Sequence, residues 1–427
     1  MNAKNLVVIV MDTVRLDYFR LALAKEAPLH TLNFMDLGQC VSPSPWTLPS
    51  HASLLTGLYP SEHGAHETET IKNLDVEGLK LKKGTLATTL RPLGYTSYLY
   101  SANPFVTPLL GFEGFDYFYD ATDYYETLNV HRRIRVGKKA RRLIAQNYGS
   151  ELWKDKDADS ALLAILKKTS PETLPALLKI LAYASANTVK WYLRLLSWKL
   201  GSGEISVKGG ADIRSKIVRT EFKQPFFTVV NLMEAHEPYF VHDNYNSALN
   251  FTVNPRGYPD SRLLDKWKSF YGKAVGRSAR YALKIAADIL KRYPRDTVIA
   301  LTSDHGQAFM EHGYLGHGTM LYDEIVQVPF LLLTGEKKDL SGGDGFATLV
   351  NYKKFAVAAA HGELEPSLLR SAEVYSESFG THLGATSAGL DLAKYRELNK
   401  YRKRVFRLAS GTQESATTPA ATKPSWS

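Results

Sequence analysis

The chain has 427 residues, of which 44% are hydrophobic and 22% are charged, so it is long enough to bury a large core. This composition excludes a disordered, collagen-like or small disulfide-stabilised protein. The single cysteine, Cys40, excludes an internal disulfide, and the expected compartment is the cytoplasm. The net charge of +10 is unevenly spread, because residues 131–223 contain 20 Lys or Arg and only 8 Asp or Glu.

The two most apolar stretches are too short or too charged to predict a leader or a membrane span. Residues 6–11 form a run shorter than the core of a signal peptide, and acidic Asp12 follows it. Residues 174–198 are interrupted by Lys179, Lys190 and Arg194. We therefore expect no secretion signal and no membrane-spanning helix.

Three apolar runs predict buried strands of a parallel sheet. The runs are residues 5–11, 226–233 and 297–303. Asp12 follows the first run, His236 lies just beyond the second, and Asp304 and His305 follow the third. Because the carboxyl ends of the strands border the ligand crevice of an open α/β sheet, we expect these side chains to meet at one edge.

A loop and a short helix come after the first strand. The sequence TLPSHASLLTG places Thr47 at the cap or in the first turn of a helix over residues 50–55. A threonine there is commonly only a helix cap. The alternative is that its hydroxyl faces an anionic substrate, because the N–H groups at a helix amino terminus attract anions.

Changes of composition along the sequence predict four segments of the chain. We expect a core of residues 1–122 and 225–340, a basic helical insert of residues 123–224, a small carboxyl-terminal subdomain of residues 341–409 and a disordered tail of residues 410–427. The sequence has no internal repeat and no glycine-rich nucleotide loop.

The order of the motifs resembles the sulfatase family of the alkaline phosphatase superfamily. Residues 47–57 are similar to the family signature Cys/Ser-x-Pro-Ser-Arg followed by Thr-Gly, with Thr47 at the position of the nucleophile. The other matching motifs, in the family's order, are Asp12, SANPF, GFEGFD, HEPY, SDHG and GHGTMLYDE. The resemblance implies an α/β sandwich with a central, mostly parallel sheet flanked by helices, to which the basic helical insert is added.

Two departures from the signature change the chemistry that the resemblance implies. Sulfatases oxidise a Cys or Ser to formylglycine, which Thr47 cannot form, and His51 stands in place of the signature arginine. Relatives with a threonine nucleophile include metal-dependent phosphodiesterases and transferases of phosphoethanolamine or glycerol phosphate. The resemblance therefore favours phosphoryl over sulfuryl chemistry.

The resemblance implies that Asp12, Thr47, Asp304 and His305 bind one divalent cation. Three oxygen ligands and one imidazole suit Mn²⁺ or Zn²⁺ better than Ca²⁺, and Mg²⁺ is a further candidate. A cation beside a hydroxyl lowers its pKa, which would make Thr47 a nucleophile at neutral pH.

Four further side chains are candidates for the site. His236 and His317 resemble the family histidines that contact the anionic group and assist the leaving oxygen, and both are assigned here as catalytic. Alternatively, they complete a second metal site. His51 and Asn103 are expected to bind the substrate.

These residues predict an enzyme that hydrolyses phosphate esters, including diesters, or sulfate esters through a threonine nucleophile. One alternative is a transferase of the phosphoethanolamine or glycerol-phosphate type that acts on a lipid or glycan. Another is a non-catalytic protein that binds anionic surfaces, although the complete set of metal ligands disfavours it.

The expected partner of the site is an anionic ester. Residues 131–200 predict peripheral contact with an anionic membrane or polymer, because basic and apolar residues alternate there at helical spacing. The alternative is a helical cap with its basic face in water. We do not expect nucleic acid as a partner, because no binding fold accompanies the charge.

Overall fold

The computed structural model describes residues 4–24, 32–68, 71, 75–122, 143–144, 146–148, 164–200, 208–239, 261–335, 345–380 and 403–408. The chain forms two compact units. The first consists of Met1–Ala121, Gly210–Glu237 and Asn244–Ser427, and the second of Thr122–Gly209 and Pro238–Asp243.

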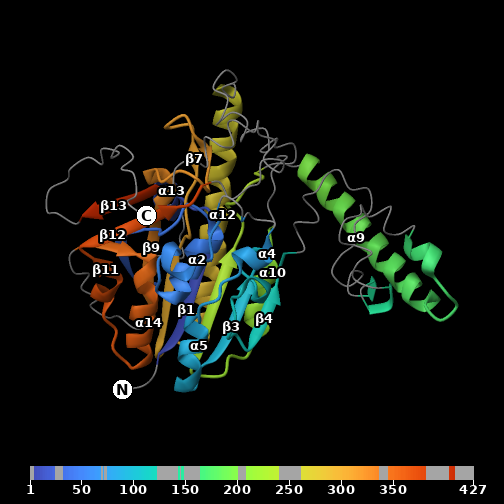
Figure 1. Ribbon diagram of the computed structural model, residues 1–427, viewed down its shortest axis with the longest axis horizontal. Helices are drawn as coiled ribbons and strands as arrows, with labels where there is room; N and C mark the ends of the chain where they lie inside the picture. The colour runs from blue at the N-terminus through green and yellow to red at the C-terminus, as the bar shows by residue number, and fades with distance from the viewer. Residues whose placement is uncertain are drawn as a thin grey trace, which may run out of the picture. The chain divides into compact units, whose positions relative to one another are not determined.

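A nine-stranded sheet forms the centre of the first unit (Figure 1). Its order is β11-β10-β2-β9-β6-β1-β5-β3-β4. The strands are β1 (Asn5–Met11), β2 (Asn33–Val41), β3 (Thr96–Ser101), β4 (Tyr117–Asp120), β5 (Phe226–Leu232), β6 (Thr297–Thr302), β9 (Gln327–Thr334), β10 (Phe346–Thr348) and β11 (Arg370–Ser371). Five of the eight neighbouring pairs are parallel, so the sheet is mostly parallel, as predicted.

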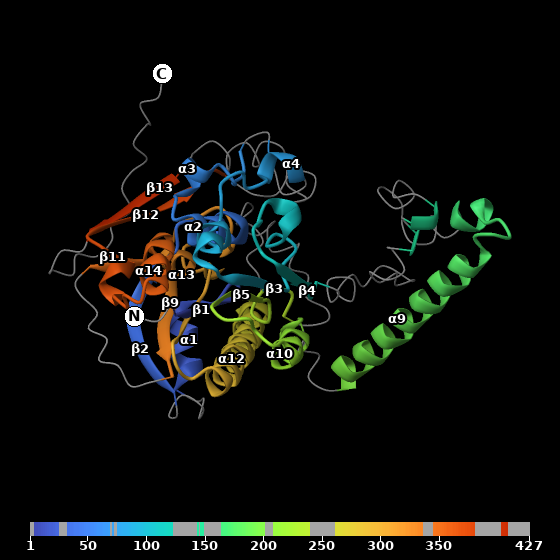
Figure 2. The same ribbon diagram turned by 90° about the horizontal axis from the view of Figure 1, so that it is seen from below.

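Helices cover both faces of this sheet (Figure 2). One layer contains α1 (Leu16–Leu23), α10 (Gly210–Arg219) and α12 (Ser261–Arg292), and the other contains α2 (Thr47–Thr56), α5 (Leu86–Leu90) and α14 (Tyr352–Ala360). Val8 and Val10 of β1 share a buried core with Leu48 and Phe355 of the second layer. Side chains alternate along a strand, so Val7 and Ile9, which are also buried, face the first layer. The predicted fold class is confirmed.

Shorter elements complete the described part of the chain. They are α3 (Pro60–His63), α4 (Val76–Leu79), η2 (Arg91–Leu93), η3 (Pro108–Leu110), β7 (Ala308–Phe309), β8 (Leu315–Gly316), α13 (Asp323–Val326), η6 (Leu349–Asn351), η7 (Pro366–Leu369), β12 (Glu373–Ser378) and β13 (Lys403–Leu408). β7 pairs with β8 and β12 with β13, each in an antiparallel two-stranded sheet.

The carboxyl-terminal segment differs from the prediction of a separate subdomain. Strand β10 pairs in parallel with β2 and so extends the central sheet. Phe355 and Ala356 of α14 are buried in the same core as the first strand. Residues 345–380 therefore belong to the first unit, because they bury their apolar side chains in its core. The predicted tail, residues 410–427, lies outside the described residues.

The predicted insert also ends earlier than expected. We expected it to run to residue 224, but α10 belongs to the first unit. Ile213 and Ile217 of this helix are buried, and Arg214 forms an ion pair of 2.7 Å with Asp288 of α12. Its apolar face and its charge pair both fix α10 to the core layer, although its sequence is as basic as the insert.

The second unit contains a single long helix, α9 (Leu174–Leu200), among its described residues (Figure 1). Leu177, Ile180 and Ala184 on this helix pack with Ile144 and Ile165 in a small core. None of the helices that the structure describes combines the length and the apolar character needed to cross a bilayer.

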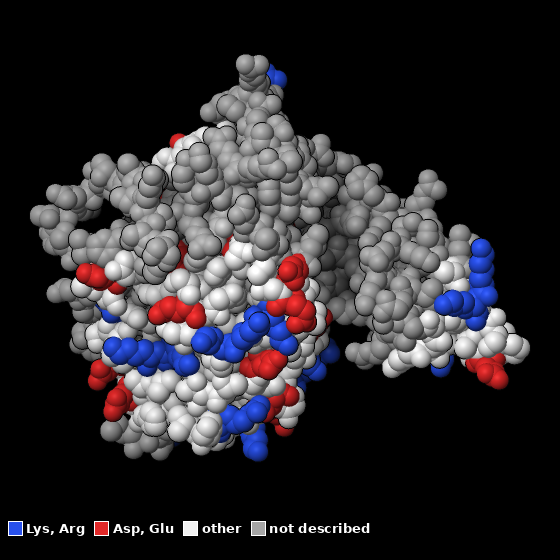
Figure 3. Space-filling model, viewed as in Figure 1, with Lys and Arg blue, Asp and Glu red and all other residues white. Residues whose placement is uncertain are grey.

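The excess positive charge lies in the sequence of the second unit. On the face shown in Figure 3, the basic and acidic side chains of the first unit are interspersed. By contrast, residues 122–209 contain 16 Lys or Arg and 8 Asp or Glu, a net charge of +8 out of +10 for the chain. The first unit is therefore close to neutral.

Candidate active site

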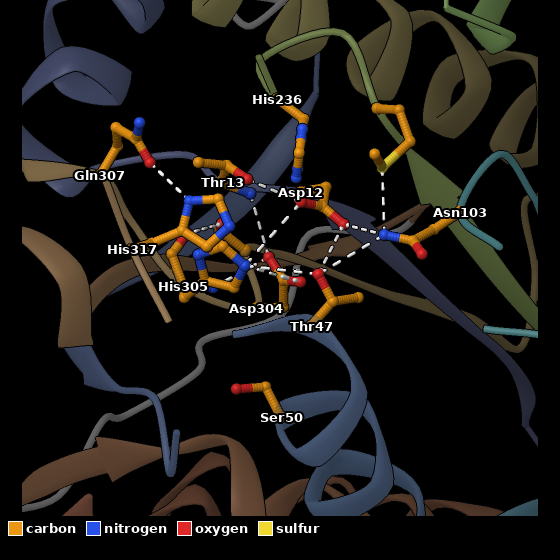
Figure 4. Close-up of polar contacts among 12 residues, drawn as sticks. Asp12, Thr13, Thr47, Ser50, Asn103, His236, Asp304, His305, Gln307 and His317 are labelled. Carbon is orange, nitrogen blue, oxygen red and sulfur yellow. Dashed lines mark hydrogen bonds and ion pairs between the residues drawn. The ribbon is translucent and has the colours of Figure 1, made fainter. Parts of the chain in front are cut away.

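Four adjacent strands deliver polar side chains to one edge of the sheet. Strands β6, β1, β5 and β3 are neighbours and run parallel, so their carboxyl ends lie together. The residues just beyond these ends include Asp304, His305, Asp12, His236 and Asn103. Figure 4 shows that they converge, and that Thr47 and His317 reach the same place from other elements.

Thr47 is the first residue of α2, and Trp46 occupies the cap position with an extended backbone. The side chain of Thr47 is therefore not needed as a helix cap. Its Oγ1 lies 3.3 Å from Asp12 Oδ2 and 3.4 Å from His305 Nε2. The hydroxyl thus lies at the positive end of a helix, next to a carboxylate and an imidazole.

Two carboxylates are buried side by side. Asp12 and Asp304 expose 1% of their surface or less. Burial and the negative charge of Asp12 raise the pKa of Asp304 well above its ordinary value. Burial also opposes ionisation of Asp12, but His236, His305 and the Thr13 hydroxyl outweigh it and lower the pKa of Asp12. Asp12 therefore keeps its negative charge, and this charge favours the protonated form of Asp304.

The backbone at Thr13 is strained in a way that serves this pair. Thr13 has a φ of 63°, which is unfavourable for a β-branched residue. In this conformation its N–H donates to Asp304 Oδ1 at 3.1 Å, and its hydroxyl donates to Asp12 Oδ1 at 2.7 Å. The turn after β1 therefore fixes both carboxylates.

The tautomer of His305 points an acceptor into the cluster. Nδ1 donates to the carbonyl of Gly306 at 2.9 Å, so Nε2 carries the lone pair. Nε2 lies 3.5 Å from Asp304 Oδ2 and 3.9 Å from Asp12 Oδ1. Burial lowers the pKa of His305 to about 4, so the ring is neutral at physiological pH.

This cluster has the composition of a metal site. The ligand atoms of Asp12, Asp304 and His305 lie within 4.8 Å of one another. Asp304 Oδ2 is buried and accepts no hydrogen bond from the described residues. Metal-binding histidines commonly donate their other N–H to a carbonyl, as His305 does. Converging acceptors, two of them from buried carboxylates, fit a divalent cation, with Thr47 as a fourth ligand.

A second group of possible ligands contains His236, Glu237 and His317. His236 donates from Nδ1 to the carbonyl of Glu237 at 2.8 Å, and His317 Nδ1 lies 2.6 Å from Gln307 Oε1. The rings of His317 and His305 lie 4.4 Å apart between their centroids. The Nδ1 atoms of His236 and His317 thus contact protein groups, which leaves Nε2 of each ring toward the cluster. From there Nε2 can give a proton or bind a metal.

Asn103 lies against Thr47. Its Nδ2 donates to Asp12 Oδ2 at 2.7 Å and lies 3.4 Å from Thr47 Oγ1 (Figure 4). Its Oδ1 accepts the backbone N–H of Phe105 at 2.7 Å, which fixes the orientation of the amide. The amide donor thus faces both the Asp12 carboxylate and the Thr47 hydroxyl.

His51 lies beneath the cluster, not at its surface. It is fully buried, and its Nδ1 donates to the carbonyl of Thr47 at 3.0 Å. Its Nε2 lies 3.2 Å from the Asn231 amide, which is itself 3.5 Å from Asp12 Oδ2. Because both ring nitrogens face protein groups, His51 supports Thr47 and does not fit the predicted contact with substrate.

Four polar residues of the site were not predicted from the sequence. They are Thr13, Asn231, Glu237 and Gln307. Asn231 could have been noticed as the polar residue within the apolar run of β5. Glu237 is the second residue of the HEPY motif, and Gln307 directly follows the SDHG motif. The prediction assigns these motifs only through their histidines and Asp304.

The family model described as Sulfatase matches residues 4–340, which cover most of the chain. The chain belongs to the sulfatase family. The motifs that resemble this family lie within the matched range, so the resemblance is confirmed at the level of the family.

Known relatives of this sulfatase-family protein are diverse. It is 33% identical over 119 residues to a protein named low-salt glycan biosynthesis sulfotransferase from Haloferax volcanii. That match spans 26% of this chain and only 28% of the relative.

Solved structures share the fold at low identity. A phosphonate monoester hydrolase from Silicibacter pomeroyi matches with a TM-score of 0.56 and 15% identity, covering 95% of this chain and 85% of that one. A 2-O GAG sulfatase matches with a TM-score of 0.53 and 12% identity, covering 89% and 78%. Both likenesses support the alkaline phosphatase-like architecture of this family member.

Proposed function

We propose that this protein is a metal-dependent hydrolase of phosphate or sulfate esters that uses Thr47 as its nucleophile. The observation that carries the proposal is the position of Thr47 Oγ1 between Asp12, His305 and Asn103 at a helix amino terminus. A protein that only binds anionic surfaces has no need for this buried cluster. Among the two ester classes, threonine favours phosphate, because formylglycine cannot form.

Asp12, Thr47, Asp304 and His305 would hold the cation, and Mn²⁺ or Zn²⁺ suits this mixture of ligands. When bound, the cation supplies a Lewis acid that favours the ionised threonine and withdraws charge from a substrate oxygen. The protein contributes the pre-formed pair of carboxylates, which the turn at Thr13 holds in place.

In the first half of the reaction, Thr47 Oγ loses its proton to water and attacks the phosphorus or sulfur, and the bond to the leaving oxygen breaks. The Asn103 amide donates a hydrogen bond to a non-bridging oxygen, whose negative charge grows in the transition state. His317 or His236, with both ring nitrogens protonated, gives the leaving oxygen the proton on Nε2 and becomes neutral. Gln307 orients His317 for this role through its contact with Nδ1.

In the second half, water gives a proton to Nε2 of the neutral histidine and attacks the group carried by Thr47, and the bond to Oγ breaks. If an alcohol takes the place of water, the product is a new ester and the enzyme is a transferase. The relative from Haloferax volcanii, which is named a glycan biosynthesis sulfotransferase, favours a glycan hydroxyl as the acceptor in this second candidate function.

A panel of chromogenic esters tests the proposal. We expect metal-stripped protein reloaded with Mn²⁺ or Zn²⁺ to turn over a phosphate diester or monoester faster than a sulfate ester. Glycerol in the assay serves as a model acceptor alcohol. Release of chromophore with free phosphate from the monoester, or with a phosphate monoester from the diester, supports the hydrolase. Conversion of the product to a glycerol ester supports the transferase.

The panel also has outcomes that contradict the proposal. Faster turnover of the sulfate ester would show that threonine does not exclude sulfuryl chemistry here. No turnover of any ester with either metal, with and without glycerol, would remove the assignment as a hydrolase. Protein that keeps its chelator serves as the control for contaminating metal-independent activity.

Replacing Asn103 by alanine is expected to lower kcat/KM about 10²- to 10³-fold, because one donor to the transition state is lost. Asn103→Asp should be at least as harmful, since it places a further negative charge beside Asp12. The matched control is Asn351→Ala, which removes an amide that contacts Ser371 at 2.9 Å, in the carboxyl-terminal segment. Equal losses in both variants would argue for a general effect on folding.

A further inference from the structure

Helix α9 carries an apolar stripe that faces solvent. Among the side chains of this helix that the structure describes, six large aliphatic ones are between 36% and 62% exposed, and they are Leu174, Leu178, Leu181, Val189, Leu193 and Leu196. Their spacing of three, four or eight residues places them on one side of the helix. At a rise of about 1.5 Å per residue, the stripe is about 33 Å long. Isolated exposed leucines are ordinary, but an aligned row of this length marks a binding surface.

The stripe is separate from the face that holds the helix in its own unit. Leu177, Ile180 and Ala184 form the packed face, and each is at most 5% exposed. The helix therefore already has a buried side for its own stability, and the exposed stripe is a second apolar side with no role in that core.

Basic residues follow one flank of the stripe. Lys179, Lys190 and Arg194 each come directly after a stripe residue in the sequence, so each lies about 100° further around the helix. Residues 174–200 contain four Lys or Arg and no Asp or Glu. The sequence of the helix thus combines apolar and basic residues with no acidic residue.

We propose that the stripe of α9 docks on the surface of an anionic lipid bilayer. The leucines would enter the boundary between head groups and acyl chains, while the basic flank stays among the anionic head groups. The charge of +8 on residues 122–209 adds long-range attraction to such a surface.

The apolar stripe distinguishes a bilayer from a soluble polyanion. An anionic polymer can neutralise Lys and Arg, but it offers no hydrocarbon in which leucines can be buried. Charge alone would leave the stripe exposed in the complex. This proposal does not depend on the reaction that Thr47 performs, because it concerns a different unit of the chain.

Vesicle sedimentation with the full-length protein tests the docking. We expect binding to vesicles of phosphatidylcholine and phosphatidylglycerol at low salt, weaker binding at high salt, and little binding to phosphatidylcholine alone. The double variant Leu178→Ser and Leu193→Ser should reduce the partition coefficient at least about tenfold, because less apolar area is buried.

The first unit offers a matched control. Leu21 and Leu109 are 65% and 69% exposed, close to the 60% and 62% of Leu178 and Leu193. The variant Leu21→Ser and Leu109→Ser should bind vesicles like the wild type. Equal losses in the two double variants would overturn the proposal, as would binding to heparin without binding to anionic vesicles.

Hydrogen exchange gives a second readout that needs no substitution. Vesicles should slow amide exchange in peptides from residues 174–200 of the wild-type protein. Binding that leaves these peptides unchanged would place the contact elsewhere and overturn the proposal. A dimer that forms without lipid and that the stripe variant abolishes would also overturn it, because a second copy would then cover the stripe.

Discussion

The Thr47→Ala variant is expected to lose at least about 10³-fold in the turnover of the best ester from the panel, because the attacking oxygen is absent. Thr47→Ser keeps the hydroxyl and should retain measurable activity. In the wild type, a rapidly quenched reaction should add a phosphoryl or sulfuryl group to the peptide that contains Thr47. Steady-state kinetics and mass spectrometry of that peptide check both expectations.

Two neighbouring hydroxyls provide controls for this experiment. Ser50 lies on the same helix as Thr47, but its Oγ contacts Ser42 Oγ and the carbonyl of Ser44, each at 2.9 Å. Figure 4 shows that it lies away from the cluster, so Ser50→Ala should remain active. Thr13 is the other hydroxyl that touches Asp12. If Thr13→Ala abolished the covalent adduct and Thr47→Ala did not, the nucleophile would be Thr13.

The second large effect is expected for Asp304→Asn, which should abolish stabilisation by metal. In the wild type, a cation at a concentration of about 100 times its Kd should raise the free energy of unfolding by about 2.7 kcal/mol. For a chain of this size, this corresponds to a rise of about 3 °C in Tm. The variant removes one of the two carboxylates, so this rise should disappear together with ester turnover.

Without metal, Asp304→Asn should make the protein more stable than the wild type near neutral pH. The pKa of Asp304 is raised in the folded state, so its contribution to stability is complete below its unfolded pKa. That contribution is lost as pH rises through the folded pKa. Asp12, with its lowered pKa, contributes stability above its unfolded pKa and loses it on acidification. Metal-free Asp304→Asn should therefore be less destabilised than the wild type between acidic and neutral pH.

Thermal unfolding with and without Mn²⁺ or Zn²⁺ across this pH range checks both expectations. Asp265→Asn is the control, because it removes an exposed carboxylate from α12, far from the strand ends in sequence. It should keep the metal-dependent rise in Tm. A rise that persists in Asp304→Asn would place the cation elsewhere, and the group of His236, Glu237 and His317 would then be the first alternative.

The strands at the centre of the sheet were predictable because their burial on both faces leaves a signal in sequence. β1 has the predicted bounds, and β5 and β6 each end one residue earlier than predicted. Parallel strands must also present their carboxyl ends at a common edge. The apolar runs and the common edge of parallel strands therefore predict that Asp12, Asp304 and His305 lie close together, as they do.

The carboxyl-terminal segment was not predictable in the same way. β10 has three residues, which is too short to show a pattern, and its pairing partner β2 is about 300 residues away in the sequence. The energy that fixes it comes from non-local hydrogen bonds and from the burial of α14. Similarly, basic residues placed α10 in the predicted insert, but buried Ile213 and Ile217 attach it to the core.

His51 shows the same limit within the site. Its position in the signature indicated a neighbour of the nucleophile, and the structure brings it to the Thr47 carbonyl. Whether it faces substrate or protein depends on how helix α2 packs against β5. Asn231 on that strand contacts the ring, so tertiary packing, and not the motif, gives His51 its supporting position.

The sequence by itself determined the family, the central strands and the residue types at the strand ends, because local runs and motifs encode them directly. Only the tertiary structure decided which atoms meet. It showed the buried pair of Asp12 and Asp304, the tautomer of His305 and the exposed stripe on α9. These features depend on packing between segments that are far apart in the sequence. Such contacts decide whether a side chain is buried or exposed, and whether it is charged.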